Sequence, residues 1–416
     1  MGYVGLGWGA SLSPRERAAP GPLRAGPVRG TIGSVGPADL IEAAFELGVD
    51  AAGLAPLAPP ADAPRLWAWL AAGRHAGMGW IERQAPRIAD PRGLVAGPGL
   101  LLVVSVSHAR PAVRLADGAR IARYAAGRDY HRWLGKRLKK LARRFERGSS
   151  RAIVDAGPLL ERSHGAEAGL GFRSKAANLL SRPFGPWFFL GELAFVWRGE
   201  APELGRARLA ADSHMDLALG SCGSCRACID ACPTQAILAP GEVDAGRCIS
   251  YHTIENRGPA PAELRASFGA WVFGCDVCSE VCPYGQRAAD QSERFGTHKE
   301  VAEGSLRRFL AAGRGASPPL DLAGSPLARA GGLGLARNAA VALGNLPSEA
   351  GRAELLAALE SVEPLLREAA AWALAQGYGR DLGVAAALER AQARESEAWV
   401  ALALAGHRER AGAPPA

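Results

Sequence analysis

Hydrophobic and polar positions follow two different periods along the first half of the chain. Residues 39–47 predict an amphipathic helix, because apolar side chains recur at helical spacing at Leu40, Ile41, Ala44 and Leu47. Residues 100–106 form a short apolar run rich in β-branched side chains, and residues 151–154 form another, so both runs predict strands. Helices and strands in succession predict an α/β domain over residues 35–205, in a chain of overall α+β class.

The last part of the chain has a helical pattern throughout. Residues 303–314 predict a helical connector, and residues 317–407 are rich in Ala and Leu. Residues 337–343 resemble residues 367–374, and residues 396–404 resemble a third, less regular copy. Regularly placed alanines would let neighbouring helices stack closely, so we expect HEAT-like helical repeats over residues 300–410. The alternative is a plain α-helical cap on the main domain.

Composition and charge narrow the class of protein. The 416 residues are enough for two or three domains. The net charge of +8 is concentrated, because residues 120–147 hold eleven basic side chains and only two acidic ones, which predicts a polyanionic partner. Residues 1–34 lack the apolar core of a signal peptide and predict a disordered extension. No uncharged run is long enough to span a membrane, so we expect a cytoplasmic protein without membrane contact.

All eight cysteines lie between residues 222 and 282. The run Cys222-Gly-Ser-Cys225-Arg-Ala-Cys228-Ile-Asp-Ala-Cys232-Pro233 has the spacing of bacterial ferredoxins, in which the fourth cysteine binds the other cluster. The second run is Cys248 followed by Cys275-Asp-Val-Cys278-Ser-Glu-Val-Cys282-Pro283. We therefore expect a ferredoxin-like domain over residues 206–295 with two [4Fe-4S] clusters. One would be held by Cys222, Cys225, Cys228 and Cys282, and the other by Cys232, Cys248, Cys275 and Cys278.

Zinc sites and disulfides are the alternatives for these cysteines. Zinc would give separate four-thiolate sites built from paired C-x2-C motifs, and this spacing supplies too many thiols too closely. Disulfides would imply secretion, for which the sequence shows no signal. Two iron–sulfur clusters are therefore the better interpretation, and the chain should be redox-active.

The domain before the cysteines should contain whatever the clusters reduce. It has no G-x-G-x-x-G that opens a βαβ unit, since Gly169-Leu-Gly171 lacks the third glycine, and a Rossmann nucleotide site is not supported. Asp155 follows the predicted strand 151–154 and precedes Gly157-Pro158, a turn that could present its side chain in a pocket. An Asp that acts as an acid near neutral pH needs burial or another carboxylate to raise its pKa. The alternative role for Asp155 is to cap the turn.

Several blocks of the sequence resemble the epoxyqueuosine reductase family, the cobalamin-dependent iron–sulfur enzymes of tRNA queuosine synthesis. The most specific are Gly127-Arg-Asp-Tyr-His131 and Val154-Asp155-Ala-Gly-Pro158-Leu-Leu-Glu161-Arg162, and Trp187-Phe-Phe-Leu-Gly-Glu192 and Gly274-Cys-Asp-Val-Cys278 extend the match. The resemblance covers about residues 39–285. It implies a nitroreductase-like, cobalamin-binding domain and a two-electron removal of the epoxide oxygen from epoxyqueuosine at the tRNA wobble position, which leaves queuosine.

The resemblance also implies roles for individual residues. Asp155 would donate a proton to the departing oxygen, and Tyr130 and His131 would form an active-site pair that orients the substrate. The cobalamin would be lined by Arg83, Asp155, Leu179, Leu190, Ser250, Asp276 and Val277. One position departs from the family pattern, because Ser174 stands where the family usually has Gly before the Lys of its 169–175 block.

A tRNA substrate would account for the basic segment directly before Asp155. Its candidate contacts are Arg132, Lys136, Arg137, Lys139, Lys140, Arg143 and Arg144, and Arg337 and Arg367 are candidates in the repeats. We expect a monomer that receives electrons from a reduced flavodoxin or a ferredoxin-type donor. Two other functions stay open: a corrinoid reductive dehalogenase, and a non-catalytic iron–sulfur electron carrier with a protein-docking helical module.

Overall fold

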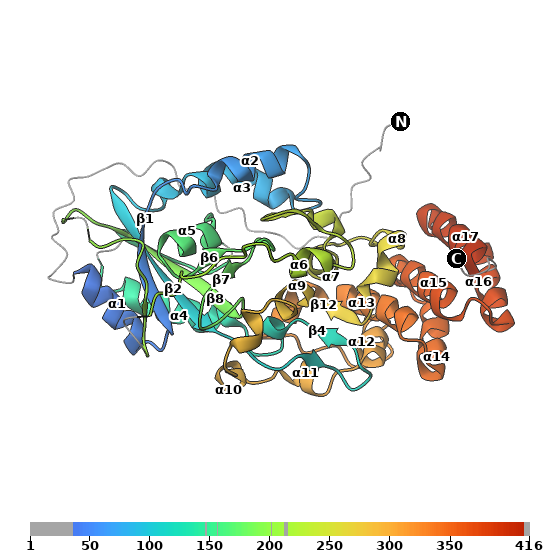
Figure 1. Ribbon diagram of the computed structural model, residues 1–416. Coiled ribbons are helices and arrows are strands. Elements are labelled where there is room, and N and C mark those ends of the chain that lie inside the picture. The colour runs from blue at the N-terminus through green and yellow to red at the C-terminus, as the bar shows by residue number, and fades with distance from the viewer. Residues whose placement is uncertain (1–35, 146–147, 156, 201, 212–214, 412–416) are drawn as a thin grey trace. The chain divides into compact units, whose positions relative to one another are not determined.

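A five-stranded antiparallel sheet organises the first part of the chain in the computed structural model (Figure 1). The structure describes residues 36–145, 148–155, 157–200, 202–211 and 215–411, so the expectation for residues 1–34 lies outside the described residues. The strand order is β5 (Ser150–Ile153), β8 (Phe188–Val196), β2 (Gly99–Ser107), β1 (Ala51–Pro56) and β9 (Arg208–Leu209). Strands β2 and β5 confirm the two strands that the sequence predicts.

The central strand β2 is apolar along its whole length because helices cover both faces of the sheet. Leu102 and Val104 pack on one face against α1 (Pro37–Glu46) and α4 (Tyr130–Ala142). Leu101 and Val103 point to the other face, which α5 (Glu161–Glu167) covers. Burial on both faces explains why the β2 sequence shows a continuous apolar run rather than an alternation. The predicted amphipathic helix at residues 39–47 is confirmed as α1.

Two short helices and a hairpin extend this part of the chain toward the cysteines. Helices α2 (Ala63–Ala71) and α3 (Gly79–Ala89) pack on each other through a small cluster that includes Leu66, Ala85 and Ile88. Strands β6 (Phe172–Arg173) and β7 (Leu179–Leu180) pair as a hairpin beside α5. These elements bring residues from several distant segments toward one side of α5.

The cysteine-rich segment contains two helices of one turn that contact each other, one beside each cysteine run. They are α6 (Ala227–Asp230) and α9 (Val277–Glu280). The hairpin of β10 (Ile237–Ala239) and β11 (Glu242–Val243) follows the first run. Between Cys248 and Cys275 the chain forms α7 (Ile249–Ile254), α8 (Ala262–Arg265) and β12 (Trp271–Phe273).

Strand β12 ties the cysteine-rich segment to the first part of the chain. It pairs in parallel with β4 (Arg120–Ile121), and β4 pairs with β3 (Val113–Arg114). Arg120 adds an ion pair to Glu280 on α9, with 2.5 Å between its Nη2 and the carboxylate Oε1. The beginning of the basic segment is therefore built into the packing against the cysteines.

Helices are the regular elements of the remaining described chain, in orange and red in Figure 1. Three short ones come first: α10 (Ser292–Phe295), α11 (Lys299–Ala302) and α12 (Leu306–Gly313). The helices of the repeat region follow: α13 (Gly331–Asn345), α14 (Glu349–Ala358), α15 (Pro364–Tyr378), α16 (Leu382–Arg394) and α17 (Ala398–Ala411). Helix α12 contacts α13, which contacts α15, which contacts α17, so the helices of this series stack one on the next.

Small residues bring the backbones of α13 and α15 close together. A Cβ added to Gly344 would stand 2.7 Å from the Cα of Ala373, which is closer than any side chain tolerates. This confirms the expected close stacking of the two most similar repeat copies. None of the helices in the described ranges combines the length and the apolar character that crossing a lipid bilayer demands.

Candidate functional site

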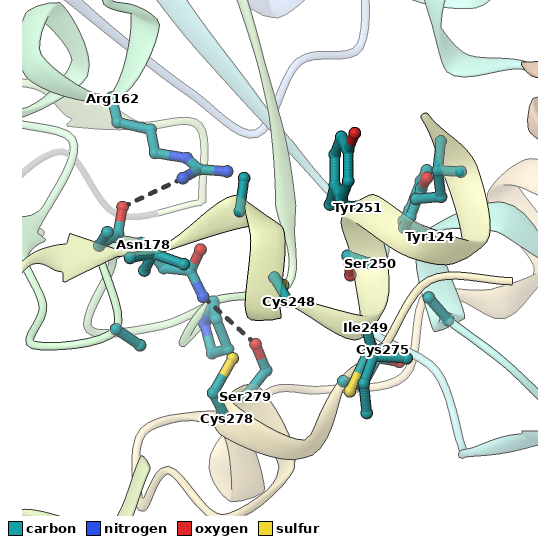
Figure 2. A pocket seen from close by; sticks show the side chains of 18 of the residues that line it. Tyr124, Arg162, Asn178, Cys248, Ile249, Ser250, Tyr251, Cys275, Cys278 and Ser279 are labelled. Carbon is teal, nitrogen blue, oxygen red and sulfur yellow. Dashed lines mark hydrogen bonds between the residues drawn. The ribbon is translucent and has the colours of Figure 1, made fainter. Parts of the chain in front are cut away.

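One cavity of about 1170 Å³ is lined by the first part of the chain, the cysteine-rich segment and the short helix before α13, and its described lining includes no residue of α10–α17. Its walls come from α3, α4, β8, α7, α9 and the short helix η6 (Pro326–Arg329). Figure 2 shows Cys248, Cys275 and Cys278 among the lining side chains, together with Arg162 and Tyr251. Pockets for small ligands measure about 300–1,000 Å³, so this cavity has room for a large cofactor and part of a substrate.

Asp155 is held at the cavity wall by the two residues that open α4. The Tyr130 hydroxyl donates to Asp155 Oδ2 at 2.8 Å, and His131 Nε2 lies 2.9 Å from the same oxygen. The other ring nitrogen, Nδ1, lies 2.7 Å from Asp129 Oδ1, and Asp129 also caps the start of α4 by accepting the His131 backbone N–H. Asp155 itself adopts φ 57°, a left-handed conformation that is uncommon outside glycine and that recurs at functional sites.

This geometry stores a proton between His131 and Asp155. A neutral imidazole donates from only one nitrogen, yet both nitrogens of His131 face carboxylate oxygens. Burial lowers the pKa of His131, but the hydrogen bonds that its ring donates to Asp155 and Asp129 outweigh it, and the net shift is upward. Burial likewise raises the pKa of Asp155, but the hydrogen bonds from His131 and Tyr130 outweigh it and hold the pKa below its ordinary value. The extra proton therefore resides on His131.

The pKa of Asp155 differs from the expectation for a proton donor. The sequence reasoning required burial or another carboxylate to raise this pKa, whereas the structure lowers it. The reason is tertiary: the first turn of α4 places a phenol and an imidazole on the same carboxylate oxygen. Asp155 can still donate a proton, because His131 holds one 2.9 Å away.

Two more carboxyl groups lie behind Asp155, and sequence reasoning assigned no role to them. Glu161 opens α5 and lines the cavity, and Glu192 lies fully buried in the middle of β8. Burial raises the pKa of Glu161 to about 8, and the charge of Asp155 contributes. Burial also raises the pKa of Glu192 well above its ordinary range, with Glu161 adding to the rise. A lone Glu within an otherwise apolar strand was the sequence signal that could have found Glu192.

The eight cysteines gather into the two predicted groups. Cys232, Cys248, Cys275 and Cys278 line the large cavity, whereas the other four and Cys278 line a smaller cavity of about 60 Å³. None of the eight is in a disulfide, so the disulfide alternative is wrong. The Lys175 ammonium donates to the backbone carbonyls of Gly223 and Cys225 at 2.7 and 2.9 Å and braces the first cysteine loop, a role that the sequence did not reveal.

The residues expected to line a cobalamin are only partly brought together. Asp155, Leu190, Ser250, Asp276 and Val277 line the large cavity, as do Tyr130 and His131. Arg83 and Leu179 are not among the described residues of its lining, although their neighbours Gln84 and Asn178 are. Ser174 is buried, and its hydroxyl accepts the backbone N–H of Asn178 at 3.0 Å, so the departure from the family pattern caps a turn at the wall of the smaller cavity.

Most of the predicted tRNA contacts lie on the outer face of α4. Arg132, Lys136, Lys139, Lys140, Arg143 and Arg144 are exposed. Arg137 is half-buried instead, because it stacks on Trp133 and donates to the Leu47 carbonyl at 2.8 Å. In the repeats, Arg337 is buried and donates to backbone carbonyls, and Arg367 is paired with Glu395. The suggestion that Arg337 offers a surface contact is wrong, because its guanidinium joins α13 to the cysteine-rich segment.

Two known families match parts of this chain. Residues 221–285 match the 4Fe-4S double cluster binding domain, and residues 89–156 match the family described as epoxyqueuosine reductase QueG, DUF1730. The first match covers all eight cysteines, and the second ends just after Asp155. These matches support iron–sulfur clusters at the cysteines.

Curated relatives and solved structures agree with the family matches. The chain is 38% identical over 349 residues to epoxyqueuosine reductase of Xanthomonas campestris pv. campestris, which covers 80% of this chain and 94% of that protein. It is 39% identical to the Pseudomonas aeruginosa epoxyqueuosine reductase over 79% of this chain and 91% of the relative. A crystal structure of epoxyqueuosine reductase with an epoxyqueuosine-modified tRNA stem loop matches with a TM-score of 0.75 at 25% identity, over 90% of this chain and 98% of that one.

Relatives of this similarity, matched over nearly their whole length, decide between the functions left open. A reductive dehalogenase and a non-catalytic electron carrier are both disfavoured, because the similar proteins share one enzymatic name. The chain belongs to the epoxyqueuosine reductase family and is an oxidoreductase.

Proposed function

We propose that the large cavity is where the epoxide of epoxyqueuosine, carried at the wobble position of a tRNA, is reduced to the alkene of queuosine. The observation that carries this proposal is the continuity of the cavity. Four cysteines line it together with Asp155, Tyr130 and His131. Electrons from a cluster and a proton from a side chain can therefore meet within one cavity.

Cobalamin fits the space between these two groups of residues. The cavity of about 1170 Å³ exceeds the size of an ordinary ligand pocket, and Trp80, Trp187 and Phe188 give it large apolar walls. Leu190, Ser250, Asp276 and Val277 would hold the cofactor, with Arg162 as a further contact. When bound, cobalamin supplies a reducible cobalt centre that can accept electrons from the neighbouring cluster and act on the epoxide carbon.

The proton comes from Asp155 in this proposal. An alkoxide leaves poorly, and general acid catalysis contributes about 10²–10⁴-fold to such steps. The proton that His131 holds moves to Asp155 and on to the epoxide oxygen, while Tyr130 keeps the carboxyl oriented. In one related structure, from Bacillus subtilis, a catalytic loop that bears an aspartate is swung out of the active site, which fits an acid on a loop after a strand.

The exposed basic face of α4 would bind the tRNA. The helix begins at the cavity with Tyr130 and continues with Lys136, Lys139, Lys140 and Arg143 exposed to solvent. A related enzyme has been crystallised with a modified tRNA stem loop, which supports a tRNA substrate here. Phosphate contacts of this kind make affinity depend strongly on salt.

The proposal also assigns the domain types, the electron donor, the oligomeric state and the location of the protein. The first sheet and its helices form the nitroreductase-like domain, and α13–α17 form HEAT-like repeats. Cys225 is exposed, so a cluster held by Cys222, Cys225, Cys228 and Cys282 would receive electrons from a reduced flavodoxin or ferredoxin-type donor. The enzyme would act as a monomer in the cytoplasm.

Anaerobic reconstitution tests the proposal. Protein loaded with iron, sulfide and cobalamin is given a chemical reductant and tRNA that carries epoxyqueuosine, and the tRNA nucleosides are analysed by mass spectrometry. We expect queuosine to form only with both cofactors present. Absence of conversion by fully loaded protein would overturn the proposal.

A further inference from the structure

The proton balance of the reaction leaves one proton unassigned. An epoxide becomes an alkene and water by taking up two electrons and two protons, because both C–O bonds break and the oxygen leaves as water. Asp155 delivers one proton at a time, and its partner His131 stores one. A second proton must therefore reach Asp155 within each turnover.

Two acidic residues near Asp155 could supply this proton: Glu161, which is half-buried at the cavity wall, and Glu192, which is fully buried. Glu192 is 0% exposed, and neither of its oxygens receives a hydrogen bond from an N–H or O–H in the described part of the chain. The group that faces it is the carboxyl of Glu161, one oxygen of which is equally shielded. Two carboxyl groups in contact are satisfied only when at least one of them carries a proton.

The side chains around Glu161 and Glu192 do not fully compensate a negative charge on either carboxyl group. Asp155 adds a like charge from the loop after β5, and α4 contributes Tyr130 and His131 beyond it. Helix α5 contributes Arg162, whose guanidinium is also engaged with the Ala177 carbonyl at 3.1 Å, and the buried His164. On the β2 side, Val103 lies opposite Glu192, and Ser105 carries the nearby hydroxyl. A buried charge without a partner is costly, so neutral carboxyl groups are the stable state.

The pair is connected to Asp155 rather than isolated in the core. Glu192 is the register partner of Ile153 at the end of β5, two residues before Asp155. Glu161 lines the same cavity as Asp155, and the Asp155 backbone N–H lies toward its carboxyl group. The route from the pair to Asp155 therefore runs along one wall of the active cavity.

We infer that Glu161 and Glu192 are both protonated at rest and that the pair resupplies Asp155 with one of its two protons during the reaction. This inference rests on the proposed function. The O–H bond of Glu161 breaks, the proton forms a new O–H bond on Asp155, and the pair keeps one negative charge. A proton from solvent in the cavity restores the pair, and the two electrons of the reaction come from the clusters. Both glutamates act through Asp155 and do not touch the epoxide.

The activity test uses Glu161→Gln and Glu192→Gln in the fully reconstituted enzyme. We expect kcat to fall about 10²-fold in each, with KM for tRNA unchanged, because the side-chain shape is kept and only the proton store is removed. In the wild type, kcat should fall as pH rises through about 8, where Glu161 loses its proton, and Glu161→Gln should lack this alkaline limb. The double variant should be no slower than the slower single variant, since the two carboxyls work as one unit.

An infrared measurement tests the store without relying on turnover. A carbonyl band of protonated carboxyl groups should be present at pH 7, shift in heavy water, lose intensity in each single Gln variant and disappear in the double variant. Glu203→Gln is the matched control, because its side chain is 74% exposed in the same domain, and it should keep the rate, the pH profile and the band.

Negative results can contradict either the proposed function or the inference about the glutamates, and the two cases can be told apart. A wild type that does not convert epoxyqueuosine contradicts the proposed function, while the infrared band still reports on the pair. A wild type that converts its substrate, together with Gln variants that keep both the rate and the alkaline limb, overturns the inference. The absence of a protonated carboxyl band in the wild type overturns it as well.

Discussion

The side chains around Asp155 set the hydrogen bonds and the orientation of its carboxyl group. Its carboxylate accepts hydrogen bonds from Tyr130 and His131 on one oxygen, and its backbone adopts φ 57°. His131 is in turn fixed by Asp129, so the imidazole ring cannot rotate without breaking two contacts. The result is a carboxyl group held at a defined orientation beside an imidazole, which is the pre-organisation that the proposed acid catalysis requires.

Replacing Asp155 by Asn tests this arrangement. An amide keeps the shape but cannot transfer the proton, so we expect turnover to fall by about 10²–10⁴-fold. Cluster spectra and cobalamin binding should stay as in the wild type, because the cysteines and the apolar cavity walls are untouched. Single-turnover conversion of tRNA-bound epoxyqueuosine measures the decrease, and an unchanged rate would show that the proton comes from another group.

At the scale of elements, α4 connects three tasks in one helix. Its first turn supplies Tyr130 and His131, and its buried face packs Leu134, Leu138 and Leu141 on the sheet. Its outer face carries the basic side chains. This helix sets the distance between its basic outer face and the cavity, so the proposed tRNA binding and the proposed chemistry would be coupled through a single element.

Charge removal on α4 tests its part in tRNA binding. Lys136→Gln combined with Lys140→Gln should weaken tRNA binding and reduce the slope of log K against log salt by about 0.7–0.9 for each phosphate that the protein no longer neutralises. The value of kcat at saturating tRNA should change little. Arg390→Gln on α16, far along the sequence, serves as a control for each single lysine variant, and an equal weakening in that variant would contradict a footprint centred on α4.

The stacked helices depend on small residues where they cross. Gly344→Val should lower the free energy of unfolding by about 1–3 kcal/mol, because its Cβ would overlap Ala373 across the α13–α15 contact. Gly332→Ala in the same helix meets no neighbouring atom and should stabilise by about 0.5–1 kcal/mol, since Ala favours helix. Thermal unfolding of both variants checks the pair, and equal shifts would rule out tight packing as the cause.

At the scale of the whole molecule, the cavity exists because distant segments are folded against one another. Strand β12 pairs with β4, and Arg337 on α13 donates to the carbonyls of His252 and Gly258 in the cysteine-rich segment. These interactions hold the cysteines against the sheet that carries Asp155. Loosening them would separate the cysteines from Asp155, which are the proposed sources of electrons and of the proton.

The proposed cross-over of cluster ligands can be tested by replacing one cysteine from each run. Cys232→Ser should damage the cluster beside the large cavity, although Cys232 belongs to the first cysteine run, and Cys282→Ser should damage the outer cluster. Electron paramagnetic resonance and iron content distinguish the two, because each variant should keep one cluster. Disappearance of the outer cluster in Cys232→Ser would contradict the assignment.

The sequence by itself determined whatever depends on local spacing. It predicted α1, the strands β2 and β5, the two cysteine groups and the position of Asp155 after β5, because periodicity and ligand spacing are properties of short segments. Family resemblance brought Tyr130 and His131 to the same site. The exposure of most basic residues of α4 could also be predicted from the sequence, since a run of charged side chains cannot be buried.

Only the tertiary structure decided which groups share an environment. The pKa of Asp155 depends on neighbours from α4, and burial of Arg337 depends on packing across the chain. Glu161 and Glu192 lie 31 positions apart in the sequence and meet only because α5 covers the face of β8 to which Glu192 points. Proton affinity, unlike helix period, is set by what surrounds a group in space, and no short segment of the sequence contains that information.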